Sequence, residues 1–134
     1  MIAVDTNVLV RYVTNDDPEQ ARLAMQVLAH PQGVFISKTV ILETEWVLRA
    51  AFRASREAIE KALLTVAGLP QVILENPEQI AKAIEYYNQG LDFADALHYA
   101  ASETSASFHT FDVKFAKRGK TIGLAVEIIA DNSQ

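Results

Sequence analysis

Short apolar runs rich in β-branched residues alternate along this chain with longer stretches of helical periodicity, and this alternation is the strongest constraint on its fold. The runs that resemble strands cover residues 2–5, 34–37, 72–74, 107–111 and 125–129. They are largely apolar and lack polar alternation, which is typical of parallel strands buried on both faces. We therefore expect an α/β fold, a three-layer α/β/α sandwich with a mainly parallel sheet of four to five strands.

Helical patterns fill the intervals between these runs. Pro18 follows Asp17, and Ser55 precedes Arg56 and Glu57; both arrangements are typical helix starts. The predicted helices are a short one after Thr6 and the segments 17–28, 39–52, 55–66, 76–88, 92–103 and 113–119. No repeat, low-complexity tract or linker interrupts the 134 residues. We therefore expect a single domain, 1–134, that is long enough to bury a core.

The composition narrows the class of protein. Half of the residues are hydrophobic and 22% are charged, as in globular proteins, and no run approaches the ~20 apolar residues of a membrane helix. There is no cysteine, which excludes disulfides and thiolate metal sites and fits a reducing compartment such as the cytoplasm. We expect neither a signal peptide nor a membrane partner. The net charge of −5 argues against a nucleic-acid coat protein, but an enzyme whose bound metal ions supply positive charge remains compatible.

Two aspartates follow strand-like runs directly. Asp5 ends the first run, in MIAVDTNVLV, and Asp112 follows the fourth, SFHTF. Each could cap the helix that comes next, because an aspartate in that position accepts hydrogen bonds from free N–H groups. Each also lies at the carboxyl end of a strand, where open parallel sheets bind ligands. Thr110 offers a hydroxyl at the same edge as Asp112.

The helical segment TVILETEWVLRAAF contains two acids with different surroundings. Glu45 lies four residues before Arg49, so we expect it on the solvent face in an ion pair. Glu43 has no such partner and borders the apolar arc. A carboxylate in apolar surroundings is rarely unpaired unless it binds a metal ion. Glu43 is therefore the preferred functional acid. The arc on which this assignment depends comprises Val40, Ile41, Thr44, Val47, Leu48, Ala51 and Phe52.

Two more acids begin the segment LDFADALHYA. Asp92 fits the position of a helix cap, which is the interpretation we prefer for it. Asp95 lies in the first helical turn, beside the apolar arc, where the helix dipole favours an anion. We prefer a functional role for Asp95.

Helix starts at the carboxyl edge of one parallel sheet would gather Asp5, Asp95 and Asp112, and Glu43 could reach them from the neighbouring helix. Such carboxylates repel one another unless cations lie between them. Carboxylate clusters are oxygen sites for Mg²⁺ or Mn²⁺. These ions bind phosphates and activate water, and the pattern therefore favours phosphodiester chemistry.

The motifs DTNVLV, ILETEWVL, FADALHYA and TFD, in this order and covering nearly the whole chain, resemble the PIN-domain ribonucleases, and among them the VapC-type toxins of bacterial or archaeal toxin–antitoxin pairs. The resemblance implies a PIN-like sandwich and Mg²⁺- or Mn²⁺-dependent endonucleolytic cleavage of RNA. It implies a homodimer inhibited by a cognate antitoxin. The catalytic metal ligands would be Asp5, Glu43, Asp95 and Asp112.

Four further polar residues match accessory positions of that family. Thr6, Asn7 and Thr110 would orient carboxylates or water, and Asp92 matches a position that is often acidic. Asn7 is also expected to tie the turn between strand and helix through its side-chain amide. None of the three histidines forms a convincing zinc or acid–base set.

Basic residues after Asp112 are candidates for RNA contacts. Lys114, Lys117, Arg118 and Lys120 could form a rim that binds phosphates, and Arg11 could join it. The alternative is a solvated helix end. Leu42 and Trp46 lie on the side of their helix that carries arginines, where they mark either an interface or a second packing face.

Three alternatives stay open at this point. One is a PIN nuclease of RNA processing that is not a toxin. A second is a Mg²⁺-dependent phosphatase with an aspartyl nucleophile, which would want a second aspartate where Asn7 stands. The third is a non-catalytic binding domain whose acids are all caps, which leaves the mid-helix Glu43 unexplained.

Overall fold

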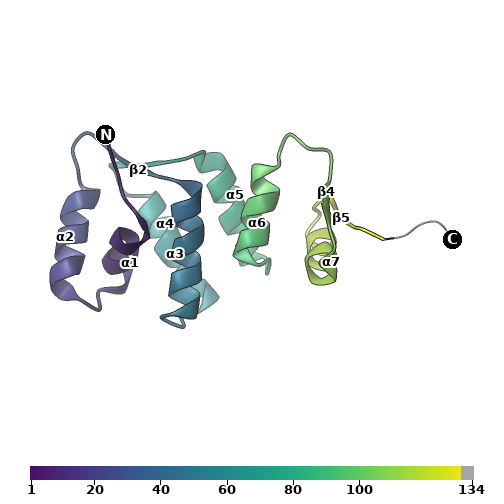
Figure 1. Ribbon diagram of the computed structural model, residues 1–134, viewed down its shortest axis with the longest axis horizontal. Helices are drawn as coiled ribbons and strands as arrows, with labels where there is room; N and C mark the ends of the chain where they lie inside the picture. Colours follow the sequence, from purple (N-terminus) through teal and green to yellow (C-terminus); the bar gives the residue numbers. More distant parts are fainter. Residues whose placement is uncertain (131–134) are drawn as a thin grey trace. The chain divides into compact units, whose positions relative to one another are not determined.

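The computed structural model describes residues 1–130 and places five strands and seven helices within them (Figure 1). In chain order these are β1 (Ile2–Ala3), α1 (Thr6–Thr14), α2 (Pro18–Leu28), β2 (Val34–Ile36), α3 (Lys38–Ala50), α4 (Arg56–Ala67), β3 (Val72–Leu74), α5 (Pro77–Asn88), α6 (Phe93–Ala101), β4 (Phe108–Thr110), α7 (Val113–Thr121) and β5 (Val126–Ile128). Every predicted strand and helix is present, with ends that differ by one or two residues.

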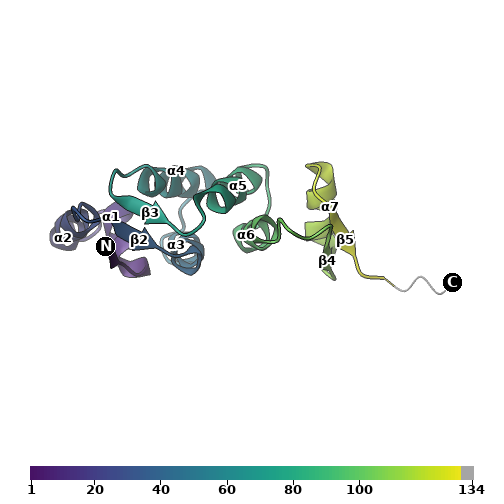
Figure 2. The ribbon, with the colours of Figure 1, turned by 90° about the horizontal axis from the view of Figure 1, so that it is seen from above.

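The chain divides into two compact units, residues 1–80 and 81–134, and α5 begins in the first and ends in the second. The first unit contains a three-stranded parallel sheet in the order β1-β2-β3, with Ala3 opposite Phe35 and Ile36 opposite Leu74. Val34 and Ile36 are completely buried because helices cover the sheet on both faces. Figure 2 shows α4 on one side of this sheet and α1 and α3 on the other.

The second unit is built around the parallel pair β4 and β5, which α7 connects. An aromatic chain fills its interior: the Tyr99 ring meets Phe108 at 6.3 Å between centroids, and Phe108 meets Phe115 at 5.5 Å. The Tyr99 hydroxyl accepts a hydrogen bond from the Ala125 N–H at 2.9 Å. These contacts attach α6 to both strands of the unit.

The predicted α/β fold with helices and parallel strands is confirmed. The strands hydrogen-bond as one sheet of three and one of two, a division that the apolar runs do not indicate. Two predicted caps are also confirmed, since the Asp17 carboxylate accepts from Gln20 N–H and the Ser55 hydroxyl from Ala58 N–H. Within residues 1–130, no helix is both long and apolar enough for a membrane span.

The expected solvent position of Glu45 is wrong. Its side chain is 3% exposed, although it does pair with Arg49, with Nε and Oε2 2.9 Å apart. The buried stripe of α3 consists of Ile41, Thr44, Glu45 and Leu48. This stripe is rotated from the predicted arc, because apolar residues occur on several sides of α3 and its neighbours decide which side is buried.

Candidate active site

Asp5 occupies the N-cap position of α1, directly after β1, with an extended backbone. Its side chain is exposed and makes no capping hydrogen bond. The cap alternative therefore does not account for this acid. The carboxylate at the carboxyl end of β1 keeps its oxygens available for a ligand.

Thr6, the first residue of α1, connects this turn to α3. Its side chain is buried, and its hydroxyl donates a hydrogen bond to Glu43 Oε1 across 37 residues of sequence. Glu43 itself is exposed on α3. Because Thr6 immediately follows Asp5, the hydrogen bond holds Glu43 at the turn that carries Asp5. The first unit therefore brings together the first two predicted acids and one predicted accessory hydroxyl.

In the second unit, Asp92 and Asp112 are helix caps. Asp92 accepts a hydrogen bond from Ala94 N–H on α6, and Asp112 accepts one from Phe115 N–H on α7, both at 3.1 Å. The cap interpretation of Asp92 is confirmed. Thr110 accepts a hydrogen bond from Asp112 N–H at 3.0 Å. Thr110 therefore shapes the turn that presents Asp112 at the carboxyl end of β4.

Asp95 is half-buried in the first turn of α6, and its pKa is raised. Burial is the main cause, and the negative charges of Asp92 and Asp112 add to it, while His98 acts in the opposite direction. Asp92 and Asp112 thus lie close enough to Asp95 to raise its pKa within the second unit. A nearby cation would stabilise the charged form of Asp95.

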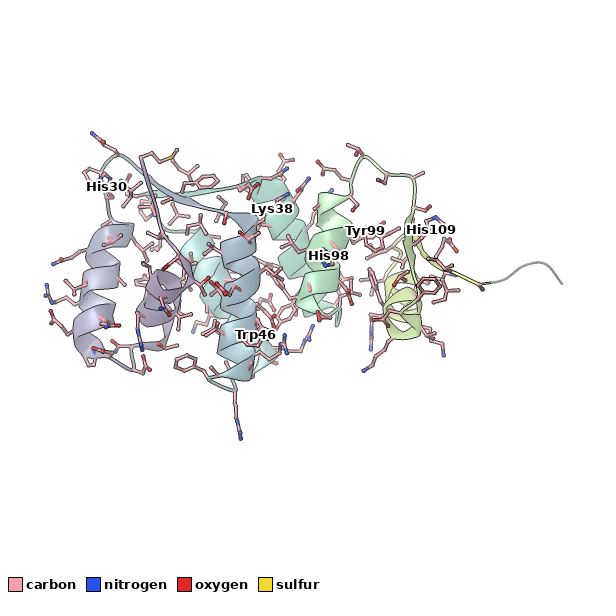
Figure 3. All side chains as sticks on the ribbon, in the orientation of Figure 1. His30, Lys38, Trp46, His98, Tyr99 and His109 are labelled. Carbon is pink, nitrogen blue, oxygen red and sulfur yellow. The ribbon has the colours of Figure 1, made fainter. Side chains whose placement is uncertain are left out.

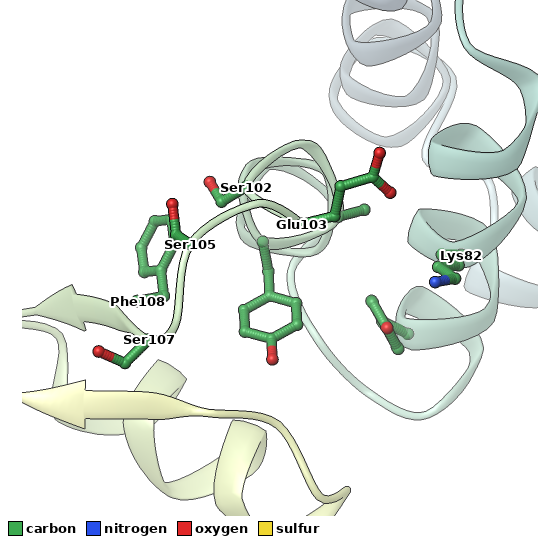
Figure 4. Close-up of a pocket in the computed structure, with 9 residues that line it drawn as sticks. Lys82, Ser102, Glu103, Ser105, Ser107 and Phe108 are labelled. Carbon is green, nitrogen blue, oxygen red and sulfur yellow. The ribbon is translucent and has the colours of Figure 1, made fainter.

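Within residues 1–130 no histidine belongs to a group of three side chains that could hold a metal ion, although His98 is close enough to Asp95 to affect its pKa. Figure 3 shows His98 on α6 and His109 on β4. His109 is exposed, and its Nε2 is 2.8 Å from the Ser107 hydroxyl. A cavity of about 210 Å³ opens at the amino end of β4 (Figure 4). Its lining includes Lys82 on α5 and Ser105 in the loop between α6 and β4. It lies at the opposite end of β4 from Asp112.

Asn7 and Arg11 lie on the exposed side of α1, beside a hollow of about 270 Å³ that α1 forms with α2. Within the described residues Asn7 makes no side-chain hydrogen bond, so the expectation that its amide ties the turn is wrong. Arg11 forms an ion pair with Asp16 at 3.0 Å. Its predicted contact with RNA stays a prediction.

The predicted basic rim is exposed on α7. Lys114, Lys117 and Arg118 reach solvent, whereas Lys120 lies 3.6 Å from Glu127. Trp46 on α3 is 56% exposed, which does not fit a second packing face (Figure 3).

Sequence reasoning did not single out Phe111, whose side chain is 77% exposed beside Asp112. No signal could have marked it, because an aromatic residue in a strand-like run is ordinarily expected to be buried.

The four predicted acids thus divide equally between the units: Asp5 and Glu43 in the first, Asp95 and Asp112 in the second. Over residues 1–130, no three acidic or histidine side chains are close enough to hold one metal ion. The donor set is nevertheless suited to a hard cation, because it consists of carboxylates of which one lacks its capping bond and another has a raised pKa. The assembly of all four acids into one site stays a prediction.

Comparison with known families finds one model that matches this chain. The family model described as PIN domain matches residues 2–120. Among solved structures, the chain is similar to Mycobacterium tuberculosis VapC20, described as a sarcin-ricin loop cleaving toxin, with 20% identity and a TM-score of 0.42 over 92% of this chain and 96% of that one. No curated protein matches the sequence.

Proposed function

We propose, since this chain belongs to the PIN-domain family, that it is a metal-dependent endoribonuclease with Asp5, Glu43, Asp95 and Asp112 as its acidic centre. The observation that carries the proposal is the hydrogen bond from Thr6 to Glu43. It links a mid-helix acid, which cannot be a cap, to Thr6, the residue that follows Asp5. We propose that the two units form one PIN-like domain, 1–134, and the family match over residues 2–120, which includes residues of both units, supports this.

The four carboxylates would hold Mg²⁺ or Mn²⁺. When bound, such an ion supplies positive charge that activates water and stabilises charge on phosphate oxygens. Thr6 holds one oxygen of Glu43, so that the other is presented in a defined direction. Thr110 fixes the backbone of Asp112, and Asp92 caps α6 and so supports Asp95. No serine, cysteine or histidine nucleophile is required.

Within this class we propose that the protein is the toxin of a type II toxin–antitoxin pair, acting in the cytoplasm to inhibit translation or growth. The support is the order and spacing of the motifs DTNVLV, ILETEWVL, FADALHYA and TFD. Its partners would be an RNA substrate, a cognate antitoxin and a second copy of the chain. The alternative of an RNA-processing nuclease shares the same site.

The other two alternatives have less support. A phosphatase with Asp5 as nucleophile would want an aspartate at the position of Asn7. A binding domain whose acids are all caps conflicts with the uncapped side chain of Asp5 and with the position of Glu43.

A cleavage assay with purified, antitoxin-free protein tests the nuclease. Structured RNA is incubated with Mg²⁺ or Mn²⁺ and with chelator, for the wild type, Asp5→Asn and Glu43→Gln. We expect metal-dependent cleavage that both variants lose, whereas Glu78→Gln, an exposed acid at the start of α5, retains it. Undiminished cleavage by Glu43→Gln would place the site elsewhere, and phosphate trapped on Asp5 would support the phosphatase.

A growth assay tests the toxin. Induced expression of the wild type should arrest growth, Glu43→Gln should not, and co-expression of a small reading frame adjacent to the gene should restore growth. If the active nuclease leaves growth unchanged, the RNA-processing alternative is favoured.

A further inference from the structure

Phe111 is the most exposed large hydrophobic side chain of the described residues, at 77%. It lies between Thr110 and Asp112, at the carboxyl end of β4. Burial of a phenylalanine ring stabilises a fold, and this position forgoes that gain. The other rings of the same unit, including Phe108 and Phe115, pack against one another. The exposed ring lies beside an acid of the proposed centre, in a position where a ligand bound at that centre would cover it.

The helix that begins two residues after this ring, α7, carries basic residues. On α7, Lys117 and Arg118 follow Lys114 by three and four residues, so each of them lies on the same side of the helix as Lys114. All three are exposed, and no carboxylate within residues 1–130 forms an ion pair with them. The guanidinium of Arg118 lies against the turn at Gly90, since a Cβ built there would be 3.3 Å from Arg118 Cζ. Arg118 thus lies near the turn that leads to Asp92.

We propose that Phe111 is a stacking platform for an unpaired RNA base and that Lys114, Lys117 and Arg118 bind the adjoining phosphates. Single-stranded nucleic acid is bound by this combination of aromatic rings and basic groups. A base within a duplex is stacked on its neighbours and cannot cover the ring. The platform therefore selects substrates with an unpaired nucleotide next to the bond that is cut. This inference rests on the proposed nuclease function and assigns a determinant of its specificity.

A binding measurement in the inactive Glu43→Gln background separates the platform from the chemistry. The probes are a labelled, unstructured 12-nucleotide RNA and the same strand annealed to its complement. Phe111→Ala should weaken binding of the single strand by about 5–100-fold and leave duplex binding nearly unchanged. Phe111→Trp should retain affinity, whereas Phe111→Leu, which keeps an apolar side chain without the ring, should lose most of it. Phe52→Ala removes another exposed ring, in the first unit, and is the matched control.

Fluorescence reports stacking directly, because the chain has one tryptophan. In a protein that combines Phe111→Trp with Trp46→Phe, the single strand should quench the emission of the new indole, and the duplex should not. Thermal unfolding of each variant verifies that loss of binding is not loss of the fold.

Two outcomes would overturn the platform. One is a Phe111→Leu variant that binds the single-stranded RNA with the same affinity as the wild type. The other is a Phe111→Ala variant that keeps its RNA affinity but changes its oligomeric state, which would identify an interface between proteins. Failure of the nuclease proposal is distinguishable, since it would appear as cleavage by Glu43→Gln whatever happens to binding at Phe111.

Discussion

The two units hold their acids by different physical means. In the first, Asp5 and Glu43 are exposed, Asp5 has no capping bond, and a buried threonine hydroxyl orients Glu43. In the second, Asp112 is engaged as a helix cap, and Asp95 is half-buried with a raised pKa. The first pair is positioned by a side-chain contact and the second by helix starts. Removing the charge of an acid should therefore cost less stability in the first unit than at Asp112 in the second.

The largest expected effect is common to both units and tests whether they act together. Neutralising any one of Asp5, Glu43, Asp95 or Asp112 as the amide should reduce RNA cleavage by at least about 100-fold, because each change removes a proposed metal ligand. Cleavage rates at saturating Mn²⁺ measure this. If the two acids of one unit were dispensable, the centre would belong to the other unit alone.

The hydroxyl that positions Glu43 should have the next largest effect. Thr6→Val keeps the buried volume but removes the donor, and should reduce cleavage by about 10–100-fold and raise the metal concentration required for half-maximal activity. Thr6→Ser should restore both quantities. Thr65→Val on α4, which removes a hydroxyl that donates only to the Lys61 carbonyl of the same helix, is the control. An unchanged metal requirement in Thr6→Val would remove the hydroxyl from the site.

Helix capping distinguishes Asp112 from Asp5. Asp112→Ala should lower the free energy of unfolding by about 1 kcal/mol, whereas Asp112→Asn retains a capping oxygen and should lose activity with little loss of stability. Asp5→Ala should change stability less than Asp112→Ala, since no capping bond is removed. Urea unfolding curves measure both. Equal losses for the two alanine variants would contradict the distinction between the units.

The smallest effect concerns Asp95. Its folded pKa lies above the ordinary 3.8, so ionised Asp95 costs stability, and this cost is absent below pH 3.8 and complete above the folded pKa. In metal-free buffer at pH 7, Asp95→Asn should therefore raise the melting temperature by on the order of 2 °C, with no gain at pH 3. Asp92 and Asp112 add to the cost, and His98 opposes it. A variant that melts below the wild type at pH 7 would contradict this account.

Much of the fold and of the local structure was predictable from the sequence. Apolar runs located every strand, and Asp17 and Ser55 marked helix starts because capping is a local interaction. The cap function of Asp92 followed from the same reasoning. The pairing of the strands into sheets of three and two did not, since similar apolar runs carry no information on which edges meet.

The candidate site was predictable in its residue types more than in its interactions. An acid within an apolar helix marked Glu43, but its hydrogen bond with Thr6 joins residues 37 positions apart and needs the packing of α1 against α3. The exposure of Phe111 could not be predicted from the sequence either. A strand-like pattern predicts the backbone conformation and not the solvent exposure of one side chain.

By itself, the sequence determined the elements, their order and the acids at their ends, because periodicity, capping and turn chemistry act over a few residues. Tertiary structure alone decided that Glu45 is buried, that the Asp5 side chain makes no capping hydrogen bond and that burial, with the charges of Asp92 and Asp112, raises the pKa of Asp95. Burial and charge at a side chain depend on whatever packs around it, and most of those neighbours are distant in sequence.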